Sequence, residues 1–205
     1  MSIELLVKHP KTFLNTNAVW VGNEFAWKAK GTPDTKLWPV TLRRNQGKKC
    51  TQSDGTDVPC WDIVIAQSLD CAMAFYLPYV PNTTKEMTLS TKGRLFITDT
   101  LDGCTFAHNG GGTAKVAHLN YTEGKAEGGR LDQPTIDGEV DRLFPTGAST
   151  LKKADYDTKT KGNVTVIGVL RPGGAWEFVY QRRDFKGVAH TTQEFQLISV
   201  HRIRG

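Results

Sequence analysis

The chain has 205 residues, of which 39% are hydrophobic and 23% charged, a composition typical of a globular domain and not of a disordered or fibrous protein. This length suits one sizeable core, so we expect a single domain over residues 1–205. The net charge of +5 is dispersed along the chain, which favours solubility but gives only weak support for nucleic-acid binding, and we expect no direct nucleic-acid partner.

The predicted elements are mostly short strands. Alternating and β-branched apolar residues predict strands at Phe25–Ala29, Leu37–Arg43, Trp61–Gln67, Met73–Val80, Arg94–Thr100, Thr105–His108, Ala114–Tyr121, Asn163–Leu170, Trp176–Arg182 and Glu194–Ile203. Clusters rich in glycine and asparagine, such as Asn109–Gly112 and Arg171–Gly174, mark the turns between them. Strands at this spacing are typical of a β-sandwich or a strongly curved mixed sheet.

Two helices are expected near the middle of the chain. In the first, Ile136, Val140, Leu143 and Phe144 are apolar residues at positions i, i+4, i+7 and i+8. Asp132 or Gln133 is its expected N-cap, and Pro134 lies in its first turn. A second, short helix is predicted at Thr150–Tyr156 with Ser149 as its cap, before a polar surface loop at Asp155–Gly162. The fold class is therefore α+β: a mostly antiparallel or mixed β-sandwich with one or two helices packed on it.

The apolar stretches of the chain match neither a signal peptide nor a membrane span. The short apolar run Ile3–Val7 contains Glu4, so it does not resemble the core of a signal peptide. No stretch approaches the roughly 18 apolar residues that a membrane span needs. We expect neither a Sec leader nor a membrane segment in this chain.

Histidine and cysteine spacing gives little support for a metal. The five histidines form no i, i+4 pair and no two cysteines have zinc-knuckle spacing, so we expect no metal site. Cys50 and Cys60 flank a Gly/Asp-rich loop and are either a disulfide in an oxidising environment or two loop thiols. Cys71 precedes an apolar run and is most simply a small core residue.

Cys104 has a different setting. It follows the Leu101-Asp102-Gly103 step at the end of a predicted strand, where the glycine allows a sharp bend that exposes the sulfur and neighbouring amides. His118 lies on the far arm of the following hairpin, beyond a glycine-rich tip. An adjacent histidine stabilises a thiolate nucleophile, and a hydroxyl can orient the imidazole. The spacing alone, however, favours a buried structural cysteine with a hairpin histidine on the surface.

These residues resemble the glutamine deamidase toxins, most closely those of the Burkholderia lethal factor type and more distantly the catalytic domain of cytotoxic necrotizing factor. The matching pattern is Leu95-Phe96-x-Thr98-x-x-Leu101-x-Gly103-Cys104-x-x-Ala107-x-x-Gly110-Gly111, followed by His118. The bacterial chemoreceptor deamidase shares the catalytic arrangement. The resemblance covers roughly Arg94 to Tyr121, and it implies that Cys104 is the nucleophile, His118 the base and Thr98 the residue that orients the base.

The resemblance also implies a function. It indicates cofactor-independent deamidation of a glutamine side chain on a host protein, with the amides of Gly103 and Cys104 stabilising the oxyanion. The family's targets are Rho-type GTPases or a translation-initiation RNA helicase. A bacterial toxin or effector of this kind is secreted or injected and acts in the host cytoplasm.

Two departures from the family pattern leave alternatives open. Asp102 replaces the family's serine, and a carboxylate beside the nucleophile is expected to raise the thiol pKa. The loop before His118 is longer, so His108 or Thr100 are alternative partners of Cys104. Strand alternation does not separate Thr98 from Thr100, because both lie on one face.

Other functions remain open from the residues alone. A papain-like protease places its cysteine at a helix N-terminus, whereas the residues after Cys104 indicate a strand and a turn. Transglutamination would use the same Cys–His pair with an amine in place of water. A non-catalytic β-sandwich could instead bind protein or carbohydrate through exposed tryptophans, with Trp20, Trp27, Trp38, Trp61 and Trp176 as candidates.

Overall fold

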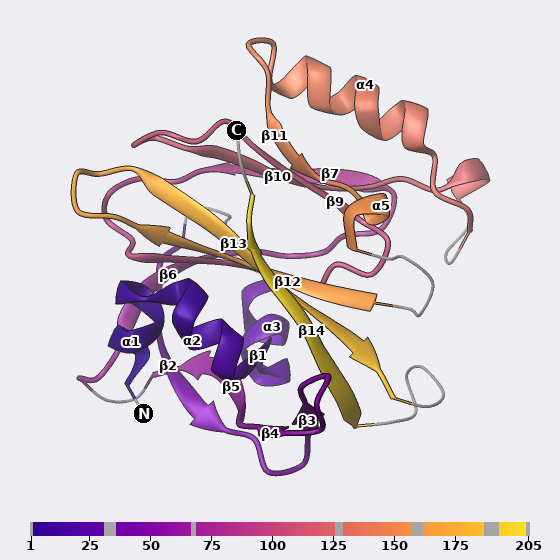
Figure 1. Ribbon diagram of the computed structural model, residues 1–205. Coiled ribbons are helices and arrows are strands. Elements are labelled where there is room, and N and C mark those ends of the chain that lie inside the picture. Colours follow the sequence, from indigo (N-terminus) through magenta and orange to yellow (C-terminus); the bar gives the residue numbers. More distant parts are fainter. Residues whose placement is uncertain are drawn as a thin grey trace.

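Two β-sheets packed against each other form the body of the molecule (Figure 1). The computed structural model describes residues 2–30, 36–66, 69–125, 129–156, 162–186 and 193–203. The larger sheet has ten strands in the order β1-β5-β2-β6-β8-β12-β13-β14-β3-β4, and the smaller has four in the order β11-β9-β10-β7. The fold is a single α+β domain, which confirms the fold class expected from the sequence.

The larger sheet is mixed, with parallel pairs at β1–β5, β6–β8 and β14–β3. Its strands are β1 (Ala18–Val21), β2 (Trp38–Arg44), β3 (Lys49–Thr51), β4 (Asp57–Val58), β5 (Cys60–Ile65), β6 (Ala72–Leu77), β8 (Leu95–Thr98), β12 (Gly162–Leu170), β13 (Trp176–Phe185) and β14 (Glu194–Arg202). The smaller sheet is antiparallel throughout and contains β7 (Thr83–Thr88), β9 (Thr105–His108), β10 (Lys115–Asn120) and β11 (Ser149–Leu151).

Five α-helices accompany the sheets in the described part of the chain. They are α1 (Ile3–Lys8), α2 (Pro10–Thr16), α3 (Asn23–Lys30), α4 (Gln133–Leu143) and α5 (Lys153–Tyr156), and a 3₁₀ turn, η1, covers Glu123–Lys125. The longest, α4, has eleven residues and lies over the smaller sheet (Figure 1). Within the described ranges, no helix is long and apolar enough to cross a membrane.

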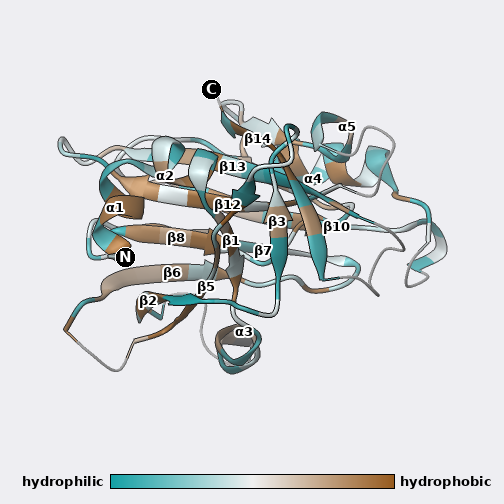
Figure 2. Cartoon of the chain, turned by 60° about the horizontal axis from the view of Figure 1, so that its bottom comes forward, coloured by the Kyte–Doolittle hydropathy of each residue, from teal (hydrophilic) through white to brown (hydrophobic). Residues whose placement is uncertain are grey.

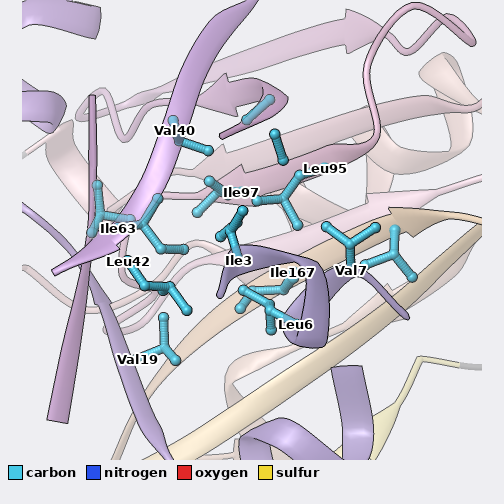
Figure 3. Packing of buried hydrophobic residues seen from close by; sticks show 14 of the residues in the cluster. Ile3, Leu6, Val7, Val19, Val40, Leu42, Ile63, Leu95, Ile97 and Ile167 are labelled. Atoms are coloured by element: carbon cyan, nitrogen blue, oxygen red, sulfur yellow. The ribbon is translucent and has the colours of Figure 1, made fainter. Parts of the chain in front are cut away.

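Three hydrophobic layers hold these elements together. Aromatic and branched side chains of both sheets meet in the middle, where Phe96, Phe106 and Phe178 have ring centroids 5.6–5.8 Å apart. On the other side of the larger sheet, Ile3 and Leu6 of α1 pack against its strands (Figure 3). The third layer joins α4 to the outer face of the smaller sheet. Figure 2 shows the hydrophobic residues concentrated on α1, β8 and β12.

The predicted strands from Leu37 onward and the central helix are confirmed. Each of these strands lies within three residues of its predicted bounds, and Gln67, the predicted end of one of them, lies outside the described residues. Asp132 is the N-cap of α4, because its carboxylate accepts a hydrogen bond from the Thr135 amide at 3.2 Å.

Two predictions of secondary structure were wrong in type or in extent. Phe25–Ala29 is part of helix α3 and not a strand: Phe25 and Ala29, four residues apart, are buried, while Trp27 between them is 77% exposed. The short helix predicted at Thr150–Tyr156 begins only at Lys153, because Ser149 and the two residues after it pair with β9 as strand β11. Most of the predicted loop at Asp155–Gly162 lies outside the described residues.

Strand β1 pairs with β5 along one side, and along its other side its backbone is hydrogen-bonded to side chains of β13. The Val19 amide donates to the Gln181 side-chain oxygen at 2.8 Å, and the Arg183 guanidinium donates to the Val19 carbonyl. Both side chains are fully buried. The guanidinium also donates to Asn163 and lies 4.5 Å from the ring centroid of Trp20. The larger sheet therefore curls until β1 meets β13.

Candidate active site

The segment between β8 and β9 makes the bend that the sequence predicts before Cys104. An isolated bridge pairs Leu101 with Val164 of β12, and the chain then turns at Gly103, whose φ of +101° lies in the region that only glycine adopts easily. Cys104 follows and leads directly into β9. The bend thus places Cys104 at the start of the β9–β10 hairpin.

The register of this hairpin places Cys104, His118 and Asn120 on one face. His118 pairs with Phe106 and Leu119 with Thr105, so Asn120 comes opposite Cys104 and His118 lies diagonally from it, at about 7–8 Å between Cα atoms. Asn120 donates its side-chain amide to the Cys104 sulfur at 3.3 Å. This face looks toward the larger sheet, because the intervening residues of β10 pack on α4.

The alternative partners lie elsewhere. His108 stands four residues from Cys104 on the same strand, about 13 Å away, and so is at the far end of β9. Thr100 lines a separate pocket with Trp20. Thr98 is buried, and its hydroxyl accepts a hydrogen bond from the Val166 amide at 3.1 Å. Within the described residues, the Thr98 hydroxyl and the His118 ring are not joined by a hydrogen bond.

Burial sets the protonation states of the Cys–His pair. Cys104 is only 2% exposed, so the expectation that the bend exposes its sulfur was wrong, and burial raises the pKa of its thiol to about 11. The Asn120 amide opposes this rise, whereas the Asp102 carboxylate adds to it, in the direction expected from the sequence. Burial also lowers the pKa of His118 to about 4, against the pull of the nearby Asp99 carboxylate. At neutral pH both side chains are therefore uncharged in this conformation.

Neither ring nitrogen of His118 makes a hydrogen bond with the described residues. The Asp99 carboxylate and the Pro78 backbone favour the protonated form of the ring and so oppose the fall of its pKa. The Tyr79 ring centroid lies 6.0 Å from that of the imidazole. A buried imidazole without a partner is uncommon in structural cores, since an unsatisfied nitrogen costs about 1–3 kcal/mol.

A pocket of about 180 Å³ lies beside the bend. Its walls come from the loop after β6, the bend itself, the end of β10 and the segment before α4, with Tyr79, Pro81, Asn82, Asp102, Gly103, Asn120, Thr122, Gly129, Leu131 and Lys153 as lining residues. Asn120 is thus shared: its amide contacts the sulfur, and the side chain also borders the pocket. The Cys104 sulfur lies behind this wall.

Asn82 positions Asn120 and the rim of this pocket. Its backbone amide donates to the Asn120 side-chain oxygen at 3.4 Å, and its own side-chain oxygen accepts from the Thr122 amide and hydroxyl at 3.1 and 2.7 Å. Its φ of +51° is one that asparagine tolerates better than most residues. The oxygen of the Asn120 amide is therefore held, which directs its nitrogen toward Cys104.

Tyr156 fixes the bend from α5. Its hydroxyl accepts from the Gly103 amide at 3.0 Å and donates to the Cys104 carbonyl at 2.7 Å. The Gly103 amide, expected from the sequence to face an oxyanion, is bonded to Tyr156 here. While that bond is closed, the Gly103 amide is not available as a donor to another group.

Sequence reasoning missed Asn120, Asn82 and Tyr156. Asn120 could have been predicted, because it lies two residues after His118 on a predicted strand and so shares its face. The other two come from distant segments. All four cysteines are free thiols, and Cys50 and Cys60 are both buried in one small cluster. Among the described residues, no three His, Cys, Asp or Glu side chains form a group that could hold a metal ion.

The chain was compared with models of known protein families and with curated proteins. It matches none of the family models and is similar to none of the curated sequences.

Proposed function

We propose that this protein is a cysteine-dependent glutamine deamidase that acts on a protein substrate. The observation that carries the proposal is the shared face of the β9–β10 hairpin: Cys104 at a glycine bend, His118 diagonal to it, and Asn120 bonded to the sulfur beside a pocket. These are the residue types that nucleophilic catalysis by a thiol uses, and His118, which makes no hydrogen bond with the sulfur in this closed conformation, must approach it for the reaction.

In this mechanism His118 takes the proton of Cys104, and the thiolate attacks the amide carbon of the glutamine. The tetrahedral intermediate collapses to a thioester as His118 protonates the leaving ammonia. Water, deprotonated by the same imidazole, then hydrolyses the thioester to glutamate and restores the thiol. Asn120, held by Asn82, keeps the sulfur in place through these steps.

The pocket must widen for this reaction to occur. A thiol pKa of about 11, instead of 9.0, makes the thiolate about 3 kcal/mol less accessible in the closed conformation. If an entering substrate displaces Asp102 and Gly103, which form part of the pocket wall, water reaches the sulfur and the Gly103 amide is released from Tyr156. The proposal therefore includes a conformational step before chemistry.

A second candidate function is a non-catalytic β-sandwich that binds a partner. The burial of both Cys104 and His118, which leaves the pair uncharged, favours this alternative. A protease or a transglutaminase would use the same pair but give different products. A host Rho-type GTPase or a translation-initiation RNA helicase is the substrate that the family resemblance suggests.

Intact-mass and peptide analysis of a host-cell lysate tests these candidates. Incubation with the protein should convert a specific glutamine to glutamate, with a one-dalton gain, and Cys104→Ser should abolish the change. Cys71→Ser is the matched control, because Cys71 is a free, half-buried cysteine outside the site. If the lysate shows no new glutamate that depends on Cys104, the proposal is wrong, while cleaved or amine-linked products would indicate one of the other reactions.

A further inference from the structure

A second pocket lies at the opposite end of the β9–β10 hairpin from Cys104. Its volume is about 570 Å³, within the range of small-molecule sites. It is formed where the ends of β9 and β11 in the smaller sheet face β13 and β14 in the larger one, and its lining residues include His108, Ser149, Arg171, Trp176, Glu177 and Arg202. His108 is about 13 Å from Cys104 along β9, so this pocket is separate from the candidate active site.

The inner wall of the pocket is aromatic. The His108 ring lies on Phe178 with a centroid distance of 4.3 Å, and Trp176 is stacked on the same phenylalanine at 6.4 Å. Ile203 completes this wall near the end of β14. Such a surface suits the flat or branched apolar body of a ligand.

A donor group without a partner lies in the same wall. His108 and Trp176 are each 5% exposed; the indole nitrogen of Trp176 makes no hydrogen bond with the described residues, and the His108 imidazole faces the Ile203 backbone. Buried polar atoms are nearly always paired in folded proteins, so an unpaired one calls for a partner that the chain itself does not supply. Ser149 pairs with His108 across the sheet, so its side chain lies on the same face beside the imidazole.

The rim of the pocket carries a surplus of positive charge. Arg171 and Arg202 both contact the Glu177 carboxylate, each at 2.7 Å, which leaves one cation in excess. Arg171 is anchored further by a bond to the Lys8 carbonyl at 2.9 Å. Arg202, whose side chain is 57% exposed, would meet a bound anion from its place in this ion pair.

Two glycine turns hold the aromatic wall in place. The Trp176 amide donates to the Gly111 carbonyl at 3.0 Å, which ties the β12–β13 turn to the tip of the β9–β10 hairpin. The turns approach so closely that a Cβ on Gly112 would lie 3.1 Å from the Gly174 carbonyl oxygen. The pocket is therefore built into the contact between the sheets.

We propose that this pocket binds a small organic monoanion, a carboxylate carried on an aromatic or branched apolar body. The carboxylate meets Arg202 and the donors of the inner wall, and the apolar body lies on Trp176 and Ile203. A single excess cation matches a monocarboxylate better than a phosphate dianion. The proposal does not depend on the deamidase activity.

Titration followed by NMR of the tryptophan indole N–H groups tests this proposal. Three carboxylates, benzoate, phenylacetate and indole-3-carboxylate, serve as probes, and benzamide is the uncharged analogue of benzoate. The five indole signals are separate reporters, and Trp176→Phe identifies that of Trp176 by its loss. We expect at least one carboxylate to bind saturably and to shift the Trp176 signal, while benzamide binds at least about tenfold more weakly.

Arginine variants supply the matched comparison. Arg202→Gln should weaken carboxylate binding about tenfold, whereas Arg142→Gln, which alters a similarly exposed arginine in an Arg–Glu pair on α4, should leave it unchanged. Cys104→Ser should bind as the unaltered protein does, so loss of deamidase activity is distinguishable from loss of this site. The proposal is overturned if no carboxylate binds, if benzamide binds equally well, or if Arg202→Gln has no effect.

Discussion

Tyr156→Phe is the sharpest test of how the bend at Cys104 is held. The substitution removes one hydroxyl that accepts from the Gly103 amide and donates to the Cys104 carbonyl. Tyr156 is fully buried, so water cannot replace these bonds unless the bend opens. The aromatic ring remains, and with it the packing in the core between the sheets.

The expected loss of stability follows from the two bonds. Each contributes about 0.5–1.5 kcal/mol net, and each backbone group left unpaired in the interior adds a penalty of about 1–3 kcal/mol. Partial relaxation of the bend reduces this sum, so we expect the free energy of unfolding to fall by about 2–4 kcal/mol. Because the bend opens more often, Cys104 should also react faster with an alkylating reagent, by about thirtyfold for 2 kcal/mol of local destabilisation.

Urea unfolding and mass-resolved alkylation measure the two effects. Tyr121→Phe is the control, since its hydroxyl makes one partly buried bond to Thr84 at 3.0 Å and its loss should lower stability by about 1 kcal/mol or less. Alkylation of half-buried Cys71 provides an internal reference rate. Equal stability of the two variants, together with an unchanged rate at Cys104, would refute the role assigned to Tyr156.

Three further predictions concern the same region. Asn120→Leu should raise the pKa of the Cys104 thiol further, because the amide donor that lowers it is lost; thiolate titration by ultraviolet absorbance would contradict this if the pKa fell. Gly103→Ala should lower the free energy of unfolding in urea by about 1–2 kcal/mol, because a Cβ disfavours a φ of +101°; an equally stable variant would exclude backbone strain there. His118 and His108 have folded-state pKa values of about 4, below the unfolded value of 6.5. Their contribution to the free energy of unfolding is therefore fully present above pH 6.5 and is lost as the pH falls toward 4, by up to about 3 kcal/mol each. Urea unfolding across this interval should show stability rising with pH, and a flat profile would contradict the burial of both histidines in the neutral form.

Local patterns in the sequence were enough for the hairpin and for α4. The strands Thr105–His108 and Lys115–Asn120 flank a glycine-rich turn, and the antiparallel register then fixes which residues share a face. Helix α3 was missed because Phe25, Trp27 and Ala29 also satisfy a period of two, and only the exposure of Trp27 separates the two patterns. Strand β7 was missed because five of its six residues are threonines or charged, and it has a single buried side chain, that of Met87.

The contacts around Cys104 needed the tertiary structure. Tyr156 reaches the bend from 52 residues away, and Asn82 reaches Asn120 from 38 residues away. The sequence does not predict either contact, because both depend on how the two sheets and their connecting segments pack. The burial that raises the pKa of Cys104 has the same origin, and it could not be read from the residues that flank the cysteine.

The way β13 bonds to β1 also bears on self-association. A sheet normally ends in a strand with free amides and carbonyls, which invite pairing with another molecule. Here Gln181 and Arg183 occupy the outward-facing groups of Val19, and the opposite margin of the larger sheet is the two-residue strand β4. Neither margin offers a template for fibril growth, so replacing Gln181 with an apolar residue would be expected to promote aggregation through β1.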